Sequence, residues 1–203
     1  MEHRAKLTAK GRATRERIVR AAAQLMAEHG VAHTTIKDVQ AAAGVSASQM
    51  YHYFSEKSEL VSAVVEGQSD QILGSQELAL AQVHSIAELS RWRHLMVEAM
   101  RDKGCTGGCP IGSLANELAE TDPPARARLE GAFARWQALI TDCLTAAMAR
   151  GELPPGTDVD RIALSLLAGI QGGLLLSQVH RDTKPLEAAI DTMIDYLRRL
   201  APG

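Results

Sequence analysis

Two helix-start signals on either side of one glycine constrain the fold of this chain more than any other feature. Thr35 and Asp38 match the capping pattern in which a side-chain oxygen satisfies a free backbone N–H, and Ser46 and Gln49 repeat it. Gly44 lies between the two pairs and is suited to ending the first of two short helices. Two short helices joined by a turn that contains glycine indicate a helix-turn-helix.

The rest of the chain shows helical spacing of apolar residues, interrupted by glycine and proline. It is 46% hydrophobic but only 3% aromatic, and its abundant Ala and Leu favour helices. We therefore expect an all-α fold, with a three-helix DNA-binding domain at residues 1–56 and a helical bundle at residues 57–203. The expected helices are residues 15–29 with Thr14 as the cap, 35–44, one from 46, one from 56 or 57 that continues past Gly67, 85–101, 111–120, 123–150, 158–181 and 185–200.

Positive charge is concentrated at the beginning of the chain, although the formal net charge is only -2. Residues 1–20 hold seven basic side chains and two acidic ones. Clustered cations suit contact with phosphates, because the release of condensed counterions drives association with DNA. A solvated basic tail is the alternative. The basic residues are Arg4, Lys6, Lys10, Arg12, Arg15, Arg17 and Arg20.

In a helix-turn-helix the second helix enters the major groove with its N-terminal side chains toward the base edges. Gln49 has two possible roles, because its amide can bond adenine in bidentate fashion or complete the capping box with Ser46. Thr35 likewise suits either phosphate binding at a helix start or capping, and the two are compatible. The residues expected to face DNA are Thr35, Ser46, Ala47, Ser48, Gln49, Tyr51, His52 and Lys57.

Several fixed spacings agree within residues 15–60. They involve Ile18, Ala22, Leu25, Gly30, Thr35, Ile36, Ala43, Gly44, Val45, Ser46, Met50, Tyr51, His52, Tyr53, Phe54, Lys57 and Leu60. This pattern resembles the DNA-binding domain of the tetracycline-repressor (TetR) family, with Gln40 as a departure where members often carry Ala. The segment GCPIGSLANELA at 108–119 resembles a regulatory-domain motif of one branch, which includes repressors of multidrug-efflux genes. The resemblance implies nine or ten helices, a homodimer, a roughly palindromic operator in double-stranded DNA and a pocket for a small-molecule inducer.

The helix expected at 158–181 is apolar nearly all round, so its side chains cannot all face one core. We expect this helix and the last one to form a four-helix interface with a second copy, with a core inside one chain as the alternative. The expected interface residues are Leu164, Leu167, Ile170, Leu174, Ile190, Met193, Ile194 and Leu197.

The middle helices supply an apolar lining with a few polar groups, which is typical of a small-molecule pocket. The expected ligand-binding residues are Trp92, Leu95, Met96, Cys109, Phe133, Trp136, Ile140, Gln171 and Leu175. Each of them also suits an ordinary core position. We further hypothesise that a bound inducer shifts the helix at about 57–80 and thereby changes the spacing of the two recognition helices.

Cys105 and Cys109 stand four positions apart in a glycine-rich loop, so a thiol- or redox-sensing regulator is an alternative function. Cys109 immediately precedes an expected helix start, whose positive end favours the thiolate. An enzyme is disfavoured, since the sequence lacks a phosphate loop, a nucleophile elbow and histidines paired at metal spacing. The sequence shows no apolar stretch of about 18 residues and no secretion signal. We therefore expect a cytoplasmic protein with no membrane contact, metal or cofactor.

Overall fold

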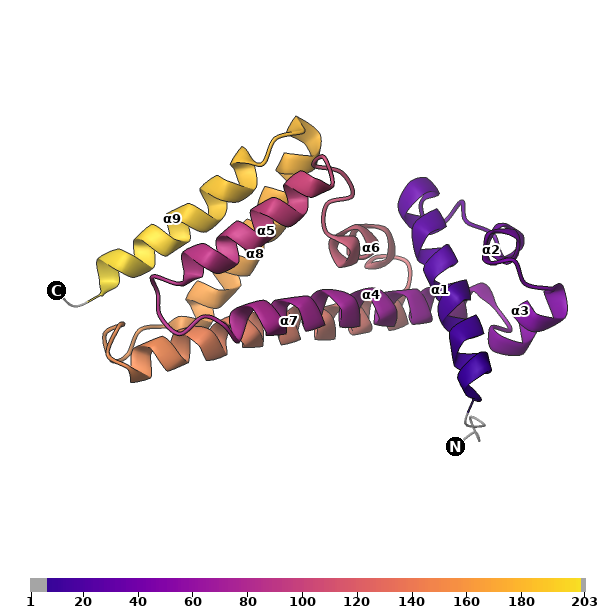
Figure 1. Ribbon diagram of the computed structural model, residues 1–203, viewed down its shortest axis with the longest axis horizontal. Coiled ribbons are helices and arrows are strands. Elements are labelled where there is room, and N and C mark those ends of the chain that lie inside the picture. Colours follow the sequence, from indigo (N-terminus) through magenta and orange to yellow (C-terminus); the bar gives the residue numbers. More distant parts are fainter. Residues whose placement is uncertain (1–6, 202–203) are drawn as a thin grey trace. The chain divides into compact units, whose positions relative to one another are not determined.

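The computed structural model describes residues 7–201, and these form nine α-helices and no strand (Figure 1). The helices are α1 (Ala9–His29), α2 (Ile36–Ala43), α3 (Ala47–Tyr53), α4 (Lys57–Leu80), α5 (Leu89–Asp102), α6 (Pro110–Leu118), α7 (Pro123–Ala149), α8 (Val159–His180) and α9 (Lys184–Leu200). This confirms the all-α fold with an N-terminal helix-turn-helix and a C-terminal helical domain.

The first helix begins earlier than the sequence pattern predicted. Thr8, rather than Thr14, caps α1, because the Thr8 hydroxyl accepts a hydrogen bond from the N–H of Gly11 at 3.1 Å. Thr14 lies inside the helix, where it is buried and donates its hydroxyl to the carbonyl of Lys10 at 3.0 Å. A hydroxyl at a helix start and one bonded back along the same helix look alike in the sequence.

The chain folds into two compact units whose boundaries differ from a simple division at residue 56. The first unit comprises the chain up to Gln68 together with Leu114–Arg128. The second comprises Ser69–Ser113 and the chain from Leu129 onward. The helices α4, α6 and α7 therefore each contribute residues to both units.

The first unit is built on apolar side chains of α1, which pack with those of the two short helices. Ile18 and Met26 of α1, Val39 of α2 and Met50 of α3 are all buried. Gly44 ends α2 with φ 60 and ψ 44, the left-handed conformation that glycine adopts without steric cost. Both capping boxes expected from the sequence are present, so the turn and the start of each short helix are fixed locally.

Residues 114–128 join the first unit through α6. The carboxylate of Glu117 accepts a hydrogen bond from the backbone N–H of Val31 at 2.7 Å. That N–H follows the end of α1 at Gly30 and lies outside any helical ladder. Because a charged acceptor strengthens a hydrogen bond, Glu117 holds the loop between α1 and α2 against α6.

In the second unit, α8 and α9 form an antiparallel hairpin in which the backbones approach closely (Figure 1). A Cβ atom on Gly173 of α8 would lie 2.8 Å from the Cα of Leu186 on α9, so only glycine fits there. The buried hydroxyl of Ser177 accepts a hydrogen bond from the N–H of Leu186 at 3.2 Å. Apolar side chains from both helices fill the space along the hairpin.

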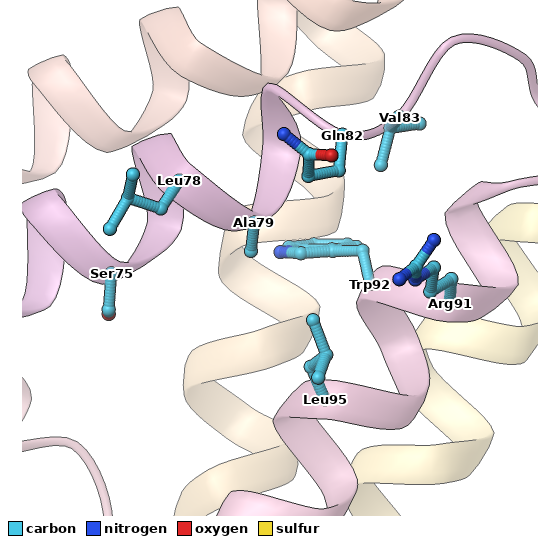
Figure 2. Close-up of a pocket in the computed structure, with 8 residues that line it drawn as sticks. All are labelled: Ser75, Leu78, Ala79, Gln82, Val83, Arg91, Trp92 and Leu95. Carbon is cyan, nitrogen blue, oxygen red and sulfur yellow. The ribbon is translucent and has the colours of Figure 1, made fainter.

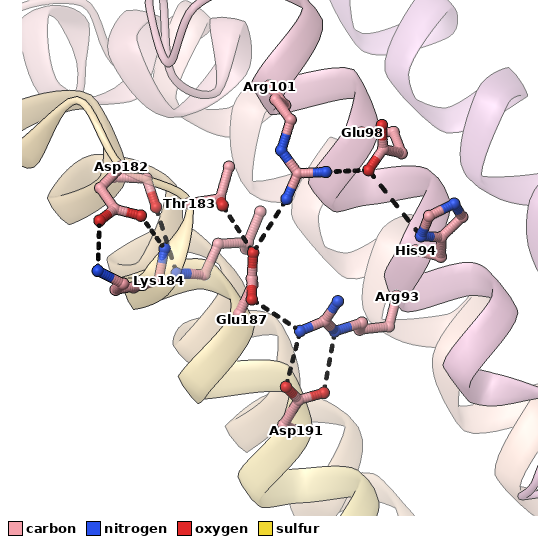
Figure 3. Close-up of polar contacts among 11 residues, drawn as sticks. Arg93, His94, Glu98, Arg101, Asp182, Thr183, Lys184, Glu187 and Asp191 are labelled. Carbon is pink, nitrogen blue, oxygen red and sulfur yellow. Dashed lines mark hydrogen bonds and ion pairs between the residues drawn. The ribbon is translucent and has the colours of Figure 1, made fainter.

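A network of ion pairs joins α5 to α9 (Figure 3). Arg93 binds Asp191 through two hydrogen bonds of 2.9 and 2.8 Å, and it also donates to Glu187 at 3.1 Å. Arg101 pairs with both Glu98 and Glu187. The hydroxyl of Thr183 and the nearby arginines lower the pKa of Glu187. The network therefore keeps Glu187 ionised and fixes α9 beside α5.

The second unit contains the one helix within residues 7–201 that is long and apolar enough to cross a membrane, which the sequence analysis did not anticipate. By length and composition α8 meets that requirement, but buried helices of soluble proteins meet it as well. Part of its surface is buried in the unit, whereas Leu164, Leu175 and Val179 are exposed. The high hydropathy of α8 thus reflects two apolar faces rather than one.

Candidate nucleic-acid interface and ligand pocket

The start of α3 presents a row of small and polar side chains to solvent. Met50 is completely buried and anchors the helix, whereas Ser46, Ala47, Ser48 and Gln49 are exposed. Farther along, Tyr51 and His52 are also exposed, and Tyr51 shows 61% of its surface. An exposed N-terminal turn with short side chains is what a helix needs to approach base edges in the major groove.

Gln49 completes the capping box. Its Oε1 accepts a hydrogen bond from the N–H of Ser46 at 3.0 Å, and the Ser46 hydroxyl accepts one from the N–H of Gln49 at 3.2 Å. A bidentate contact with adenine uses both the oxygen and the nitrogen of the amide, so it requires Gln49 to leave Ser46. The nitrogen alone can donate to a base while the box stays intact.

Thr35 is engaged in the same way at the start of α2. Its hydroxyl donates to the Asp38 carboxylate at 2.6 Å and accepts from the N–H of Asp38 at 3.2 Å. Hydrogen bonds from the side chain and backbone of Thr35 lower the pKa of Asp38, which keeps the carboxylate ionised. Because that negative charge already occupies the positive helix end, Thr35 is better suited to capping than to holding a phosphate.

Lys57 is partly buried rather than fully exposed. Its Nζ donates to the carbonyl of Ala32 at 3.1 Å, which connects the start of α4 to the loop between α1 and α2. The charge remains on the surface of the helix-turn-helix unit, but a phosphate must share it with that carbonyl.

Two arginines that the sequence analysis assigned only to a basic cluster position the helix-turn-helix. Arg17 donates through Nε to the carbonyl of Ala43 at 2.9 Å, at the end of α2. Arg15 lies over the ring of Phe54 at 5.3 Å from its centre. These contacts join residues that are far apart in the chain, so a local sequence pattern cannot predict them. Lys10, Arg12 and Arg20 are exposed, whereas Arg4 and Lys6 lie outside the described residues.

A pocket of about 360 Å³ lies in the second unit, between the C-terminal half of α4 and the start of α5 (Figure 2). Trp92 is almost completely buried and donates its Nε1–H to Gln76 at 2.9 Å, so the ring is held in place. The lining residues are Ser75, Leu78, Ala79, Gln82, Val83, Arg91, Trp92 and Leu95. Of the ligand-binding residues expected from the sequence, Trp92 and Leu95 line this pocket.

The other residues expected at the ligand site do not line this pocket. Met96, Cys109, Trp136 and Ile140 are buried, Phe133 and Gln171 are partly buried, and Leu175 is exposed. Trp136 Nε1 and Gln171 Nε2 are buried without a hydrogen-bond partner within the part of the chain that the structure describes. Apolar spacing identified helix faces that turn inward, but it did not separate core positions from pocket walls.

Cys109 does not have the lowered pKa that its place before a helix predicted. Burial raises the pKa of the thiol, and the N–H groups of Gly112 and Ile111 at the start of α6 oppose the rise only in part. Cys105 is buried as well, and the three cysteines are free thiols. A buried thiol with a raised pKa contains little thiolate at neutral pH, which disfavours a thiol-sensing role.

Most of the residues expected at a dimer interface are packed inside the chain itself. The structure buries six of them, Leu167, Ile170, Leu174, Ile190, Ile194 and Leu197. Their side chains fill the core of the second unit, so they leave no surface for a partner. Leu164 is 54% exposed and Met193 is partly exposed. The apolar surface of α8 consists instead of Leu164, Leu175, Leu176 and Val179, and we call these residues the α8 stripe.

Comparison with known proteins relates both units to one family. A model described as bacterial regulatory proteins of the tetR family matches residues 18–64, and one described as tetracyclin repressor-like, C-terminal domain, matches residues 86–193. An uncharacterized HTH-type transcriptional regulator from the lacX 3' region of Lactococcus lactis subsp. lactis is 30% identical over 193 residues, covering 90% of this chain and 92% of that protein.

Two further relatives agree with this match. The HTH-type transcriptional repressor DhaR of Mycobacterium sp. strain GP1 is 25% identical, covering 90% of this chain and 91% of its own length. The crystal structure of a TetR transcriptional regulator from Chloroflexus aurantiacus J-10-FL superposes with a TM-score of 0.81 at 28% identity, covering 96% of this chain and 98% of that one. The chain therefore belongs to the TetR family of bacterial transcriptional regulators.

Proposed function

We propose that this protein is a ligand-responsive transcriptional repressor of the cytoplasm, which binds a palindromic operator as a homodimer and releases it when a small molecule binds to the second unit. The observation that carries the DNA-binding part is the exposed N-terminal turn of α3 above the completely buried Met50. Short side chains at Ala47 and Ser48 allow a close approach to base edges, and the exposed Tyr51 and His52 add hydrogen-bonding groups.

The pocket and the helix-turn-helix share one continuous helix, which supports regulation by a ligand. Ser75, Leu78 and Ala79 of α4 line the pocket, and Lys57 at the start of the same helix binds the loop between α1 and α2. A ligand that favours one position of α4 favours one position of the recognition helix. The factor by which the ligand weakens DNA binding equals the ratio of its affinities for the free and the DNA-bound protein.

The α8 stripe supports a homodimer. Leu164, Leu175, Leu176 and Val179 expose between 49% and 70% of their surface, and they recur along one side of the helix. Exposed large apolar side chains gathered on one side of a helix are typical of an interaction surface. A second copy of the chain would cover the stripe with its own and would place two α3 helices on the two halves of an operator.

The operator proposal is tested by selecting duplexes from a random library with the full chain and measuring affinity by fluorescence anisotropy at fixed salt. Ser48→Glu should weaken binding to the selected duplex by at least about tenfold, because a carboxylate at the start of α3 is repelled by the DNA. Thr145→Glu adds the same charge to an exposed position of α7 and should leave the affinity unchanged. Equal affinity of the two variants, or no selected duplex, would refute the proposed interface.

A further inference from the structure

We infer that the pocket between α4 and α5 binds a small amphipathic carboxylate, with its charged end on Arg91 and its apolar body along Trp92. The inference rests on the proposed function only in that the ligand would be the inducer. Occupancy of the pocket by such a molecule can be measured without DNA.

The walls of the pocket are apolar and incompletely covered by the chain. Leu78 is 75% exposed and Leu95 is 50% exposed, although both contribute to the same hollow. Trp92 closes the inner end of the pocket, because its ring is almost completely buried and its Nε1–H is already bonded to Gln76, which leaves it no free polar atom. An apolar ligand body would cover the two leucines and recover the hydrophobic free energy that their exposure leaves unused.

Within residues 7–201, Arg91 is the only charged residue that lines the pocket, and no carboxylate lines it. Its side chain is exposed and takes part in no ion pair or side-chain hydrogen bond with residues 7–201. Arg93, two positions later, is by contrast fully engaged with Asp191 and Glu187. An unpaired guanidinium at the edge of an apolar hollow is complementary to a carboxylate, which it can bind through two parallel hydrogen bonds.

The arrangement in Figure 2 suits a ligand with two different ends. In that view (Figure 2) the Trp92 ring is seen edge-on, with Ser75 and Leu78 to its left and Arg91 to its right. A molecule that extends from Arg91 across Trp92 meets charge at one end and apolar carbon at the other. The volume of about 360 Å³ is near the lower end for ligand pockets, which favours a short chain or a single ring.

The test compares octanoate, octanamide and octylamine, which share the apolar body and differ in charge. Trp92 and Trp136 are the two tryptophans of the chain, so Trp136→Phe makes Trp92 the sole reporter of fluorescence. Calorimetric titration of the unaltered chain provides the same affinities if that variant folds poorly. Octanoate should bind at least about tenfold more tightly than octanamide, and octylamine should bind most weakly.

Variants of Arg91 test whether the carboxylate of octanoate binds to this residue. Arg91→Gln should bring octanoate down to the affinity of octanamide, whereas Arg91→Lys should retain part of the preference. Arg128→Gln removes an exposed arginine of α7 outside the pocket and should change nothing. Equal binding of octanoate and octanamide to the unaltered chain would show a neutral lipophile site and overturn the inference. Octanoate binding that survives Arg91→Gln, or binding of none of the three probes, would overturn it too.

Operator binding is measured separately in the presence and absence of octanoate. Binding of octanoate through Arg91 with no change in operator affinity would confirm the site but contradict its role as the inducer pocket. Loss of all sequence-selective DNA binding, with octanoate still bound, would refute the proposed function alone. The two failures are therefore distinguishable.

Discussion

At the residue scale, the capping box and the base contact proposed for Gln49 would use the same side-chain amide. The capping box occupies Oε1 of Gln49 and leaves Nε2 available to donate. A residue that caps its own helix is held in one orientation, which lowers the entropy lost when it meets a base. Capping and recognition are thus compatible when the base only accepts a hydrogen bond from Nε2. They exclude each other when the base contact uses both Oε1 and Nε2 of Gln49.

Cys109 belongs to the same scale, because its reactivity depends on its immediate surroundings. We predict that Cys109 in the chain carrying Cys105→Ser and Cys143→Ser reacts with iodoacetamide at pH 7 at least about tenfold more slowly when folded than in urea. Burial raises the pKa of the thiol and restricts access to the sulfur. Mass spectrometry of timed samples gives both rates. A folded rate equal to or above the rate in urea would restore the thiol-sensing hypothesis.

At the scale of the helix pair, the close approach of α8 and α9 depends on one position without a side chain. Gly173 faces the backbone of Leu186, which cannot move away without displacing the start of α9. The Ser177 hydroxyl fixes the same turn by accepting the N–H of Leu186. The hairpin is therefore a closely packed pair within one chain, and its inner face cannot serve a partner.

Glycine substitutions separate packing from helix propensity. We predict that Gly173→Ala lowers the free energy of unfolding by about 1–3 kcal/mol, because the added methyl group overlaps the Leu186 backbone. Gly131→Ala on α7 adds the same methyl group where no atom lies within 4 Å, so it should stabilise by about 0.5–1 kcal/mol. Urea denaturation followed by circular dichroism gives both values. Equal effects of the two substitutions would contradict the packing described for α8 and α9.

At the scale of the whole molecule, the α8 stripe and the pocket between α4 and α5 are two exposed apolar surfaces, and we propose a partner for each. The stripe runs along one side of α8 and consists of large apolar side chains, which suits a second copy of the chain. The pocket is small and includes an unpaired arginine, which suits a small anion. The proposed function requires both kinds of surface, since two recognition helices would have to be linked and then repositioned.

Introducing charge into the α8 stripe tests the dimer. We predict that Leu175→Glu yields a monomer at micromolar concentration, because burying an unpaired carboxylate in an apolar interface costs several kcal/mol. Leu78→Glu makes the same change at a leucine that is 75% exposed on α4 and should leave the dimer intact. Light scattering coupled to size-exclusion chromatography measures both masses, and circular dichroism confirms folding. A dimeric Leu175→Glu variant, or a monomeric unaltered chain, would refute the interface.

The sequence by itself determined the helices and the helix-turn-helix, because capping residues, glycines and prolines act within a few positions of where they stand. Thr35, Gly44, Ser46 and Gln49 specify their turn through bonds that span three to five residues. The same locality explains the error at α1, where Thr8 and Thr14 both suit a helix start and only the packing of Thr14 separates them.

Only the tertiary structure decided which apolar faces are buried and which polar groups meet across the chain. The sequence pattern predicted that α8 is apolar on more than one side. Only the packing of α9 determined that the side with Ile170 is buried and that Leu175 stays exposed. Similarly, Arg17 reaches Ala43 and Glu117 reaches Val31 over long stretches of sequence. Local patterns record the preferences of single helices, whereas burial and long-range hydrogen bonds arise only after helices from distant parts of the chain have packed together.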